Sequence, residues 1–302
     1  MLPQNSNPER PNRIRMVFHQ ASFKEALEII ATVNPEECHI KFSRESMSIT
    51  CVSAVKKQKS KGAAPAELTK RSQVDYKFVR EDMIKYDYRM FTPNKEPIRS
   101  YECIVNTLEF SKRVKGLNEK IFNMNMIYPT KKGEAPRLEF GTRSTSGTTF
   151  LALADSKIKS THTDHLESWF KGRDPVHRPQ CSALVTVTKS VKTNKCVGLE
   201  FCVNNRTGTF KVQCWTGSTI VFADPMSDLD DSVYEEDIPS DTYHTRYVDL
   251  QQNDWVINIH KLCVGSVANI YIRKEDNSPL IITTGIGPAG RAIFSIPDGT
   301  SA

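Results

Sequence analysis

The sequence predicts an α+β fold built from two similar halves, and three features of the 302-residue chain lead to this prediction. Many short segments alternate apolar and polar residues, which is the period of half-buried β-strands. A few longer segments repeat apolar residues at three- and four-residue intervals, as helices do. The order strand, helix, strands occurs in the first half of the chain and returns in the second half. This length suits one large or two ordinary domains.

The first half begins with a predicted strand at 14–19 and a predicted helix at 21–34. The apolar face of this helix is predicted to consist of Phe23, Ala26, Leu27 and Ile30. A second helix is predicted at 107–118 because apolar residues again follow helical spacing. Its inner face is predicted to consist of Leu108, Ser111, Val114 and Leu117. Further strands are predicted at 38–43, 47–53, 73–79, 101–107, 121–128, 137–141 and 148–154.

The second half repeats this plan more faintly. Its first helix is predicted at 182–195, although Val185, Val187 and Val191 are β-branched and favour a strand. The repeat of the first half decides for a helix. Strands are predicted at 198–205, 208–215, 218–223 and 243–250.

The C-terminal segment contains a predicted β-hairpin. Two alternating segments, 268–272 and 280–284, flank the turn-forming residues 276–278. A third strand at 292–296 ends at a proline. Upstream, 254–266 is predicted to be a helix because of the spacing of Trp255, Ile259, Leu262 and Cys263.

The composition predicts a disordered arm at 1–12, a first domain at 13–155, a connector at 156–180 and a second domain at 181–302. The connector is polar and contains proline, with an apolar group at Leu166, Trp169 and Phe170. Two biased loops interrupt the plan, a lysine cluster at 56–62 and an acidic cluster at 228–241.

Signs of catalysis are absent from the sequence. No dinucleotide-binding, phosphate-loop, nucleophile-elbow or zinc-protease motif occurs, so no catalytic residue and no cofactor is predicted. The pair of histidines in 162–165 has no second cluster of metal ligands nearby, so no metal site is predicted. Eight cysteines without a CxxC motif indicate reduced thiols in an intracellular protein. The polar start of the chain does not read as a signal peptide, and no apolar run has the length of a membrane span.

The formal net charge of +6 is concentrated in the first half. Residues 1–155 contain 26 Lys and Arg against 18 Asp and Glu, whereas residues 156–302 contain 15 against 17. A basic half is compatible with a polyanionic partner and equally with a well-solvated surface. All four predicted helices nevertheless carry cations on their outer sides, and Lys24 has Glu28 at i+4 as an ordinary partner. The candidate DNA-binding residues are Lys24, Lys112, Arg113, Lys115, Lys189, Lys192, Lys195 and Lys261.

The order of the C-terminal elements resembles the closing segment of sliding clamps of the proliferating cell nuclear antigen type, which are DNA polymerase processivity factors. In pattern and order the resemblance covers roughly residues 13–297. It implies two similar clamp-type domains, each with antiparallel sheets outside and two helices facing a DNA channel. It also implies that subunits join head to tail into a ring, with a trimer favoured and a dimer or monomer as alternatives. The implied partners are double-stranded DNA, DNA polymerase and other clamp-binding proteins.

The resemblance further implies an apolar groove for partner proteins beside the connector. By position, Ile296 and Pro297 match the apolar-proline pair of the clamp tail, Pro279 the proline before the penultimate strand, and Val52 the apolar residue after the third strand. Leu166, Trp169 and Phe170 are expected on or near the connector. Ordinary core packing is the alternative for each of these residues. The segment 157–163 is the expected strand edge for assembly.

The chain departs from the clamp pattern in three respects. It is basic where cellular clamps are acidic, and the loop 54–73 and the connector 156–180 are longer than usual. Its basic character is similar to that of viral processivity factors, some of which bind DNA as monomers or open dimers. A checkpoint-type clamp subunit is the alternative within the fold, and an uncharacterised α+β small-molecule enzyme is the alternative from another class. The expected location is the nucleus or a cytoplasmic replication site.

Overall fold

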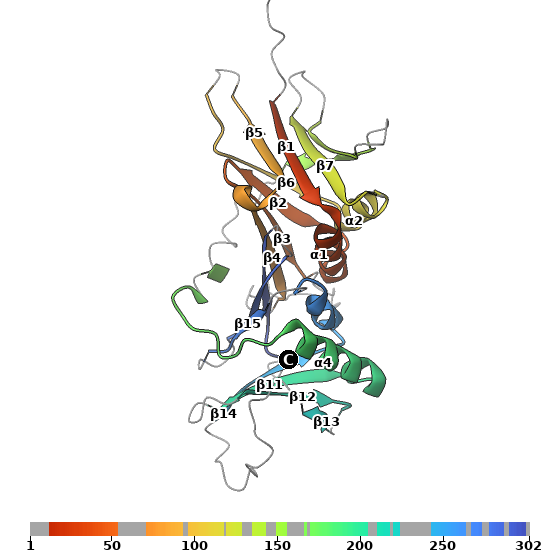
Figure 1. Ribbon diagram of the computed structural model, residues 1–302, viewed down its shortest axis with the longest axis vertical. Helices are drawn as coiled ribbons and strands as arrows, with labels where there is room; N and C mark the ends of the chain where they lie inside the picture. Colours follow the sequence, from red (N-terminus) through yellow and green to blue (C-terminus); the bar gives the residue numbers. More distant parts are fainter. Residues whose placement is uncertain are drawn as a thin grey trace, which may run out of the picture.

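The computed structural model shows an elongated molecule with one sheet towards each end, an eight-stranded sheet between them, and the helices on one side of that central sheet (Figure 1). It describes residues 12–53, 71–92, 96–117, 119–128, 135–142, 149–155, 166–167, 170–204, 210–217, 220–223, 243–263, 267–273, 278–286 and 290–299.

The chain is built from four units, and in each unit one strand runs into a helix that is followed by three strands. The first unit comprises β1 (Asn12–His19), α1 (Gln20–Val33), β2 (Cys38–Ser43), β3 (Ser46–Val52) and β4 (Gln73–Val79). The second unit comprises β6 (Ser100–Val105), α2 (Thr107–Lys115), β7 (Ile121–Tyr128), β8 (Arg137–Gly141) and β9 (Thr149–Ala152). Between and after them lie η2 (Arg80–Asp82), β5 (Lys85–Arg89) and β10 (Ala154–Asp155).

The second half repeats this order. The third unit opens with the extended segment 176–180, which forms isolated bridges from His177 to Ile270 of β15 and from Gln180 to Val267. It continues with α4 (Cys181–Asn194), β11 (Gly198–Asn204), β12 (Phe210–Trp215) and β13 (Ile220–Ala223). The fourth unit comprises β14 (Tyr243–Asp249), η4 (Asp254–Lys261), β15 (Ala268–Tyr271), β16 (Leu280–Gly285) and β17 (Arg291–Ile296).

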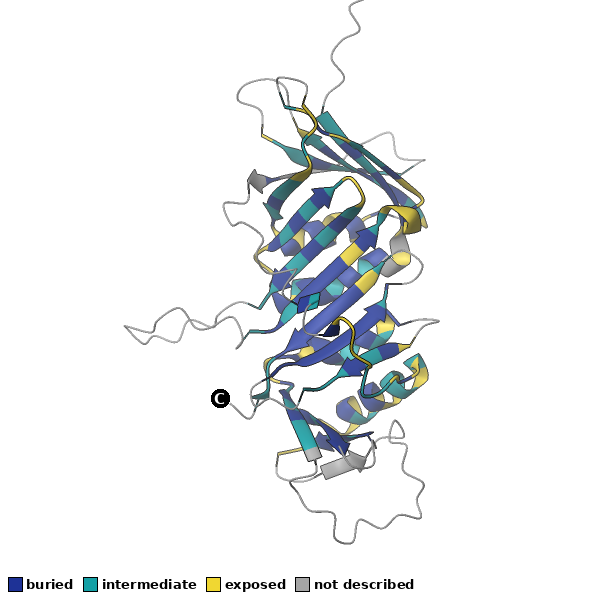
Figure 2. Ribbon diagram, turned by 90° about the vertical axis from the view of Figure 1, so that its left-hand side faces the viewer, coloured by how far each residue is buried: buried dark blue, intermediate teal, exposed yellow. Residues whose placement is uncertain are grey.

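The units are interlocked in pairs because each opening strand pairs with the partner unit. β1 pairs with β7, β6 with β2, and β14 with β11. The sheet orders are β5-β1-β7-β8-β9, β10-β6-β2-β3-β4-β17-β16-β15 and β13-β12-β11-β14. The β4–β17 pair joins the first and last units, so the central eight-stranded sheet belongs to both halves of the chain. Figure 2 views the molecule from the sheet side.

The main core lies between these sheets and the helices. Phe23, Ala26, Leu27 and Ile30 of α1 are at most 1 % exposed, as the helical period predicts. Aromatic rings from β1, α1, β4, α2 and β7 pack on one another around Phe23. A helix starts after β6 because the Asn106 side chain accepts a hydrogen bond from the Glu109 amide at 2.9 Å, which caps the first turn.

Most of the predicted elements are confirmed. The three α-helices and the strands are present, and the bounds of β2, β4, β7 and β8 agree with the prediction. The predicted hairpin is the antiparallel pair β15–β16. The eight cysteines are free, and five of the six on strands or beside η4 are fully buried at 0–1 % exposure.

Four expectations need correction. The α-helix expected at 254–266 is replaced by the 3₁₀-helix η4, which covers Asp254–Lys261. The strand β5 was not predicted. Leu108 is 43 % exposed, and Phe110 occupies the inner face of α2 in its place. The disordered arm was expected at 1–12, but Asn12 is the first residue of β1. Residues 1–11, the lysine cluster, the acidic cluster and the expected edge at 157–163 lie outside the described residues.

Candidate nucleic-acid interface and connector site

The four helices form a continuous row in which α2 contacts α1, α1 contacts η4, and η4 contacts α4. Figure 1 shows α1, α2 and α4 on the side away from the sheets. Seven of the eight predicted cations on this row are exposed, and Lys24 is half-buried. The acidic residues of the four helices are Glu25, Glu28, Glu109 and Asp254, and α4 contains none. The row therefore carries more positive than negative charge.

The cations of α4 follow from its packing. Val187, Thr188 and Val191 are buried, so Lys189 and Lys192 project from the opposite side. Lys195 follows as the C-cap with φ of 52°, a left-handed conformation that ends the helix. The predicted helix in this valine-rich segment is confirmed, and two of its β-branched valines are buried in the core.

A surface hollow of about 410 Å³ lies where α1, α2 and η4 meet. Its lining includes Lys112, Lys115, Lys261 and Glu28. Lys115 Nζ lies 3.0 Å from Glu28 Oε1, and Lys261 Nζ lies 3.9 Å from Glu28 Oε2 and 3.7 Å from Glu25 Oε2. Glu28 thus pairs with lysines from two other elements, and these ion pairs hold the lysines beside one another.

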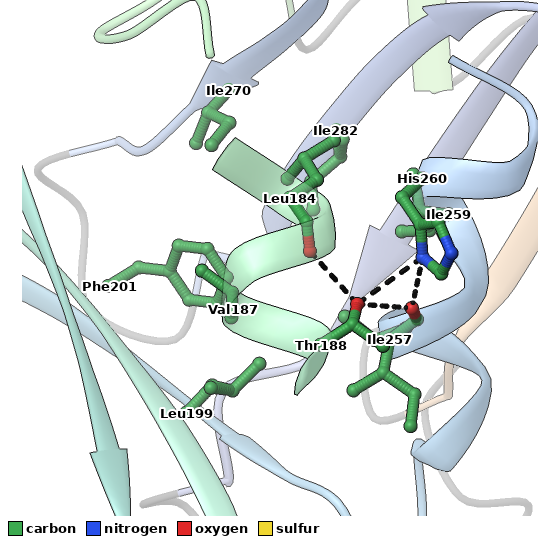
Figure 3. A pocket seen from close by; sticks show the side chains of 11 residues that line it. Leu184, Val187, Thr188, Leu199, Phe201, Ile257, Ile259, His260, Ile270 and Ile282 are labelled. Carbon is green, nitrogen blue, oxygen red and sulfur yellow. Dashed lines mark hydrogen bonds between the residues drawn. The ribbon is translucent and has the colours of Figure 1, made fainter. Parts of the chain in front are cut away.

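The junction of α4 and η4 is held by polar contacts inside an apolar setting (Figure 3). The Thr188 Oγ1 lies 2.7 Å from the Ile257 carbonyl oxygen and 2.9 Å from that of Leu184. His260 Nδ1 also lies 2.7 Å from the Ile257 oxygen, and since a carbonyl only accepts, Nδ1 carries the proton. The neighbouring cavity measures about 30 Å³ and is lined mainly by apolar side chains. These contacts set the position of the α4 cations relative to Lys261.

The connector packs on the outer face of the central sheet. Leu166 and Phe170 are 5 % and 9 % exposed and form a cluster with Ile281, Ile293 and Tyr271. The Phe170 and Tyr271 ring centroids are 5.3 Å apart. The structure therefore brings two of the predicted groove residues together on the sheet, and Trp169 lies outside the described residues.

Charged residues also attach the connector to the central sheet. Glu167 accepts a short hydrogen bond from Arg291 and lies 3.6 Å from Lys77 Nζ. The Arg291 guanidinium is 5.9 Å from the Phe170 ring centroid. Glu167 therefore links the connector to β17 and β4.

The other predicted groove residues do not join this cluster. Val52 and Pro297 are half-buried, and Pro279 is buried. Ile296 is fully buried in the main core, on the opposite side of β17 from Ile293, because successive residues of a strand face opposite ways. The sequence analysis missed Ile281, Ile293 and Tyr271, although the alternation within 291–296 would have identified Ile293.

A buried carboxyl group lies on the same outer face. Asp75 is opposite Ile293 in the register of β4 and β17 and is 5 % exposed. Gln73 Nε2 donates to its Oδ2 at 3.0 Å. Burial raises the pKa of the Asp75 carboxyl to about 7, and the negative charge of Glu167 adds to this effect.

No group of three or more potential metal-binding side chains occurs within the described ranges. No helix in these ranges is both long enough and apolar enough to span a membrane.

Comparison with known proteins shows a likeness in structure only. No protein-family model and no curated sequence matches the chain. The proliferating cellular nuclear antigen from Entamoeba histolytica is similar with a TM-score of 0.61 and 11 % identity, over 95 % of this chain and 99 % of that chain. A PCNA2–PCNA3 complex from Sulfolobus tokodaii is similar with a TM-score of 0.61 and 9 % identity, over 94 % of this chain and 98 % of that chain. The chain therefore has the α+β fold of the proliferating cell nuclear antigen clamps, with antiparallel sheets on one side and a row of helices on the other.

Proposed function

We propose that this protein is a DNA sliding clamp, a non-catalytic processivity factor that holds duplex DNA independently of sequence and tethers DNA polymerase and other replication proteins. The observation that carries this proposal is the continuous row of four helices with exposed cations, on a fold shared with clamps. Lys and Arg side chains on such a surface neutralise phosphates and do not read bases, so the bound protein can slide. We expect it to act where DNA is replicated, in the nucleus or at a cytoplasmic replication site such as that of a virus.

The repeat of the four units supports a head-to-tail ring. Inside the chain, the last strand of the first unit, β4, pairs with the last strand of the fourth unit, β17. The corresponding strands of the second and third units, β9 and β13, are edges of their sheets among the described strands. By the same geometry, β9 of one copy would pair with β13 of the next. Repeating this heterologous contact closes a ring if the rotation permits, and we favour a trimer.

The connector site is the proposed docking place for partners. Leu166 and Phe170 belong to its apolar cluster, whereas Val52 and Pro297 are half-buried outside the cluster. The residues that we propose for the groove are these four together with Trp169 and Pro279. An amphipathic helical turn with aromatic anchors would fit such a site. Ile296 would support the groove from the core and would not contact the partner.

The test of DNA binding uses the helix row. We expect simultaneous replacement of Lys112, Arg113, Lys115, Lys189 and Lys192 by Ala to weaken binding to duplexes of any sequence. The slope of log affinity against log salt should flatten by roughly 0.9 for each phosphate that the variant no longer neutralises. The matched control replaces five exposed cations away from the row, namely Arg44, Arg80, Arg99, Lys171 and Arg173. Equal slopes in both variants would remove the helix row from the DNA surface.

A subunit of a hetero-oligomeric clamp, such as a checkpoint-type clamp, is the second candidate. The Sulfolobus tokodaii structure is a complex of two different clamp chains, which is the observation that favours it. A purified chain that assembles by itself supports the homo-oligomeric clamp, whereas a chain that assembles only with a second clamp chain supports this alternative.

A further inference from the structure

A second basic surface lies on the outer face of the N-terminal sheet, β5-β1-β7-β8-β9. On β1, Ile14 and Met16 are fully buried in the core, so Arg13 and Arg15 face outward. The same alternation places the other cations of the surface on β5 and β8. This outer arginine patch consists of Arg13, Arg15, Lys85, Arg89 and Arg137.

The patch is on the opposite side of the sheet from the helix row. Phe18 of β1 faces inward and packs on Phe23 of α1, with ring centroids 4.7 Å apart. A duplex that lies along the helices therefore cannot touch the patch at the same place. The patch goes beyond the proposed channel and does not depend on it.

Carboxylates neutralise only part of the patch. Asp87 Oδ2 lies 2.9 Å from Arg89 Nη2, and Glu139 Oε1 lies 2.9 Å from Arg137 Nη2. These are the two acidic residues on the outward faces of β1, β5, β7 and β8, so five cations stand against two anions. The outward residues of these four described strands therefore carry an excess of three positive charges.

Arg13 and Arg15 are neighbours on the outward face of β1, and the residues opposite them on β5 are Arg89 and Asp87. Arg13 and Arg89 are directly opposite across β1 and β5, which is an unfavourable like-charge pair. Arg13 donates to Asn125 Oδ1 at 2.8 Å, and neither Arg13 nor Arg15 makes an ion pair within the described ranges. Their Nε atoms are buried and have no hydrogen-bond partner. An anion above the sheet would relieve this repulsion.

We propose that the outer arginine patch binds the phosphate backbone of a nucleic acid strand outside the channel. Guanidinium groups match phosphate bidentately, and four of the five cations are arginines. Residues two apart on a strand lie roughly 6.6–6.8 Å apart, so Arg13 and Arg15 are neighbours on β1, and Arg13 also faces Arg89 across the sheet. The outward residues of β1, β5, β7 and β8 include no Phe, Tyr or Trp on which a base could stack, so we expect these four strands to contact the phosphate backbone.

The experiment measures oligonucleotide binding over a range of salt concentrations in the helix-row variant, which has Ala at 112, 113, 115, 189 and 192, so that the contribution of the channel is reduced. Arg15→Gln, Lys85→Gln and Arg89→Gln are introduced together, which keeps the Arg13–Asn125 hydrogen bond. The control variant carries Arg44→Gln, Arg80→Gln and Arg99→Gln at exposed positions elsewhere. The probes are a mixed-sequence 30-mer as duplex and as single strand, and circular dichroism checks the fold.

We expect the patch variant to lose tenfold or more of its residual affinity at low salt, while the control variant keeps it. The slope of log affinity against log salt should flatten by about 2 to 3, because each lost phosphate contact accounts for roughly 0.9 on a duplex and roughly 0.7 on a single strand. The probe that loses more affinity identifies the type of strand that binds. Equal binding by patch and control variants would overturn the proposal. Displacement of the oligonucleotide by polyglutamate of equal charge, with the same dependence on the three residues, would also overturn it in favour of an acidic protein. If the helix-row substitutions leave oligonucleotide affinity unchanged and the patch substitutions lower it, the proposed channel is wrong and the proposed binding at the patch is supported.

Discussion

Glu28 shows how one residue shapes the cationic surface. It pairs with Lys115 of α2 and Lys261 of η4, so two candidate phosphate ligands already have a carboxylate beside them. In the proposed complex, DNA would compete with this carboxylate. The sequence suggested Lys24 as its partner because only neighbours on the same helix can be inferred from spacing. Contacts between α1, α2 and η4 depend on the tertiary structure.

We expect Glu28→Gln to strengthen duplex binding by about 0.5–1 kcal/mol at low salt, because exposed ion pairs are worth about that much. Stability should change little for the same reason. Fluorescence anisotropy with a labelled duplex measures the effect, and Glu45→Gln at an exposed turn serves as the control. Weaker binding by Glu28→Gln would mean that the carboxylate positions the lysines for phosphate.

Asp75 predicts a pH dependence of stability. Its pKa in the folded protein is about 7, above the value near 3.9 of an unfolded chain, so the folded state holds its proton more tightly. The contribution of this carboxyl is therefore most favourable below about pH 4 and is lost as the pH rises to about 7. Asp75→Asn should be more stable than the wild type at pH 8, and this difference should shrink at pH 5. Urea unfolding at both pH values measures it, and a constant difference would contradict the assignment.

At this scale the sequence predicted outward residues better than inward ones. The helix cations are exposed because a charged side chain has few alternatives. Leu108 and Ile296 were misplaced because an apolar residue can occupy either face, and its neighbours in the fold decide which. β17 is covered on both sides, by the main core and by the connector, so apolar residues point both ways from this strand. Its sequence therefore does not show which of them, such as Ile296, faces the core.

At the scale of elements, the connector is attached by a small and accessible set of contacts. Phe170 packs on Tyr271 and under Arg291, while Glu167 bridges to β4 and β17. The sequence indicated an apolar group in a polar linker, which predicted packing but not the surface that it would meet. That surface is formed by strands more than 100 residues away in the chain.

We expect Phe170→Ala to release the connector from the sheet without unfolding the protein. Loss of this buried side chain should lower the local opening free energy by about 2 kcal/mol. Hydrogen exchange of residues 170–173 should accelerate, whereas exchange in α1 should not change. Lys171→Ala at the adjacent exposed position is the control. If polymerase stimulation survives in Phe170→Ala, the partner does not dock at the connector.

The helices show how the internal repeat and the local helix propensity each contribute to a prediction from the sequence. The segment of α4 contains three valines that favour a strand, yet it is helical because Val187 and Val191 are buried against the second-half core. The repeat predicted this, and propensity alone did not. In contrast, the apolar spacing in 254–266 predicted an α-helix, whereas η4 is the tighter 3₁₀-helix. Over two turns, apolar spacing cannot distinguish a 3₁₀-helix from an α-helix.

At the scale of the whole molecule, the four-unit repeat was visible in the sequence as two similar halves. The sequence did not show the exchange of opening strands between units or the β4–β17 junction. Pairing between strands that are far apart in the chain leaves no local sequence pattern. The same junction supplies the model for assembly, with β9 and β13 as the complementary edges.

We expect Phe150→Asp in β9 to block assembly, and Val221→Asp in β13 to do the same, because a charge on an edge strand opposes pairing. Each variant alone should sediment as a folded monomer. An equimolar mixture should form dimers, since each variant keeps one intact edge of opposite type. A mixture that stays monomeric would show that the two strands are not partners.

The most direct test of the clamp is the shape of the purified wild-type protein at micromolar concentration, seen by electron microscopy and weighed by sedimentation. We expect a closed ring of three copies of the 34.2 kDa chain, with the helices of every copy facing a central hole. Single elongated particles, both in the free protein and in the presence of duplex DNA, would contradict it.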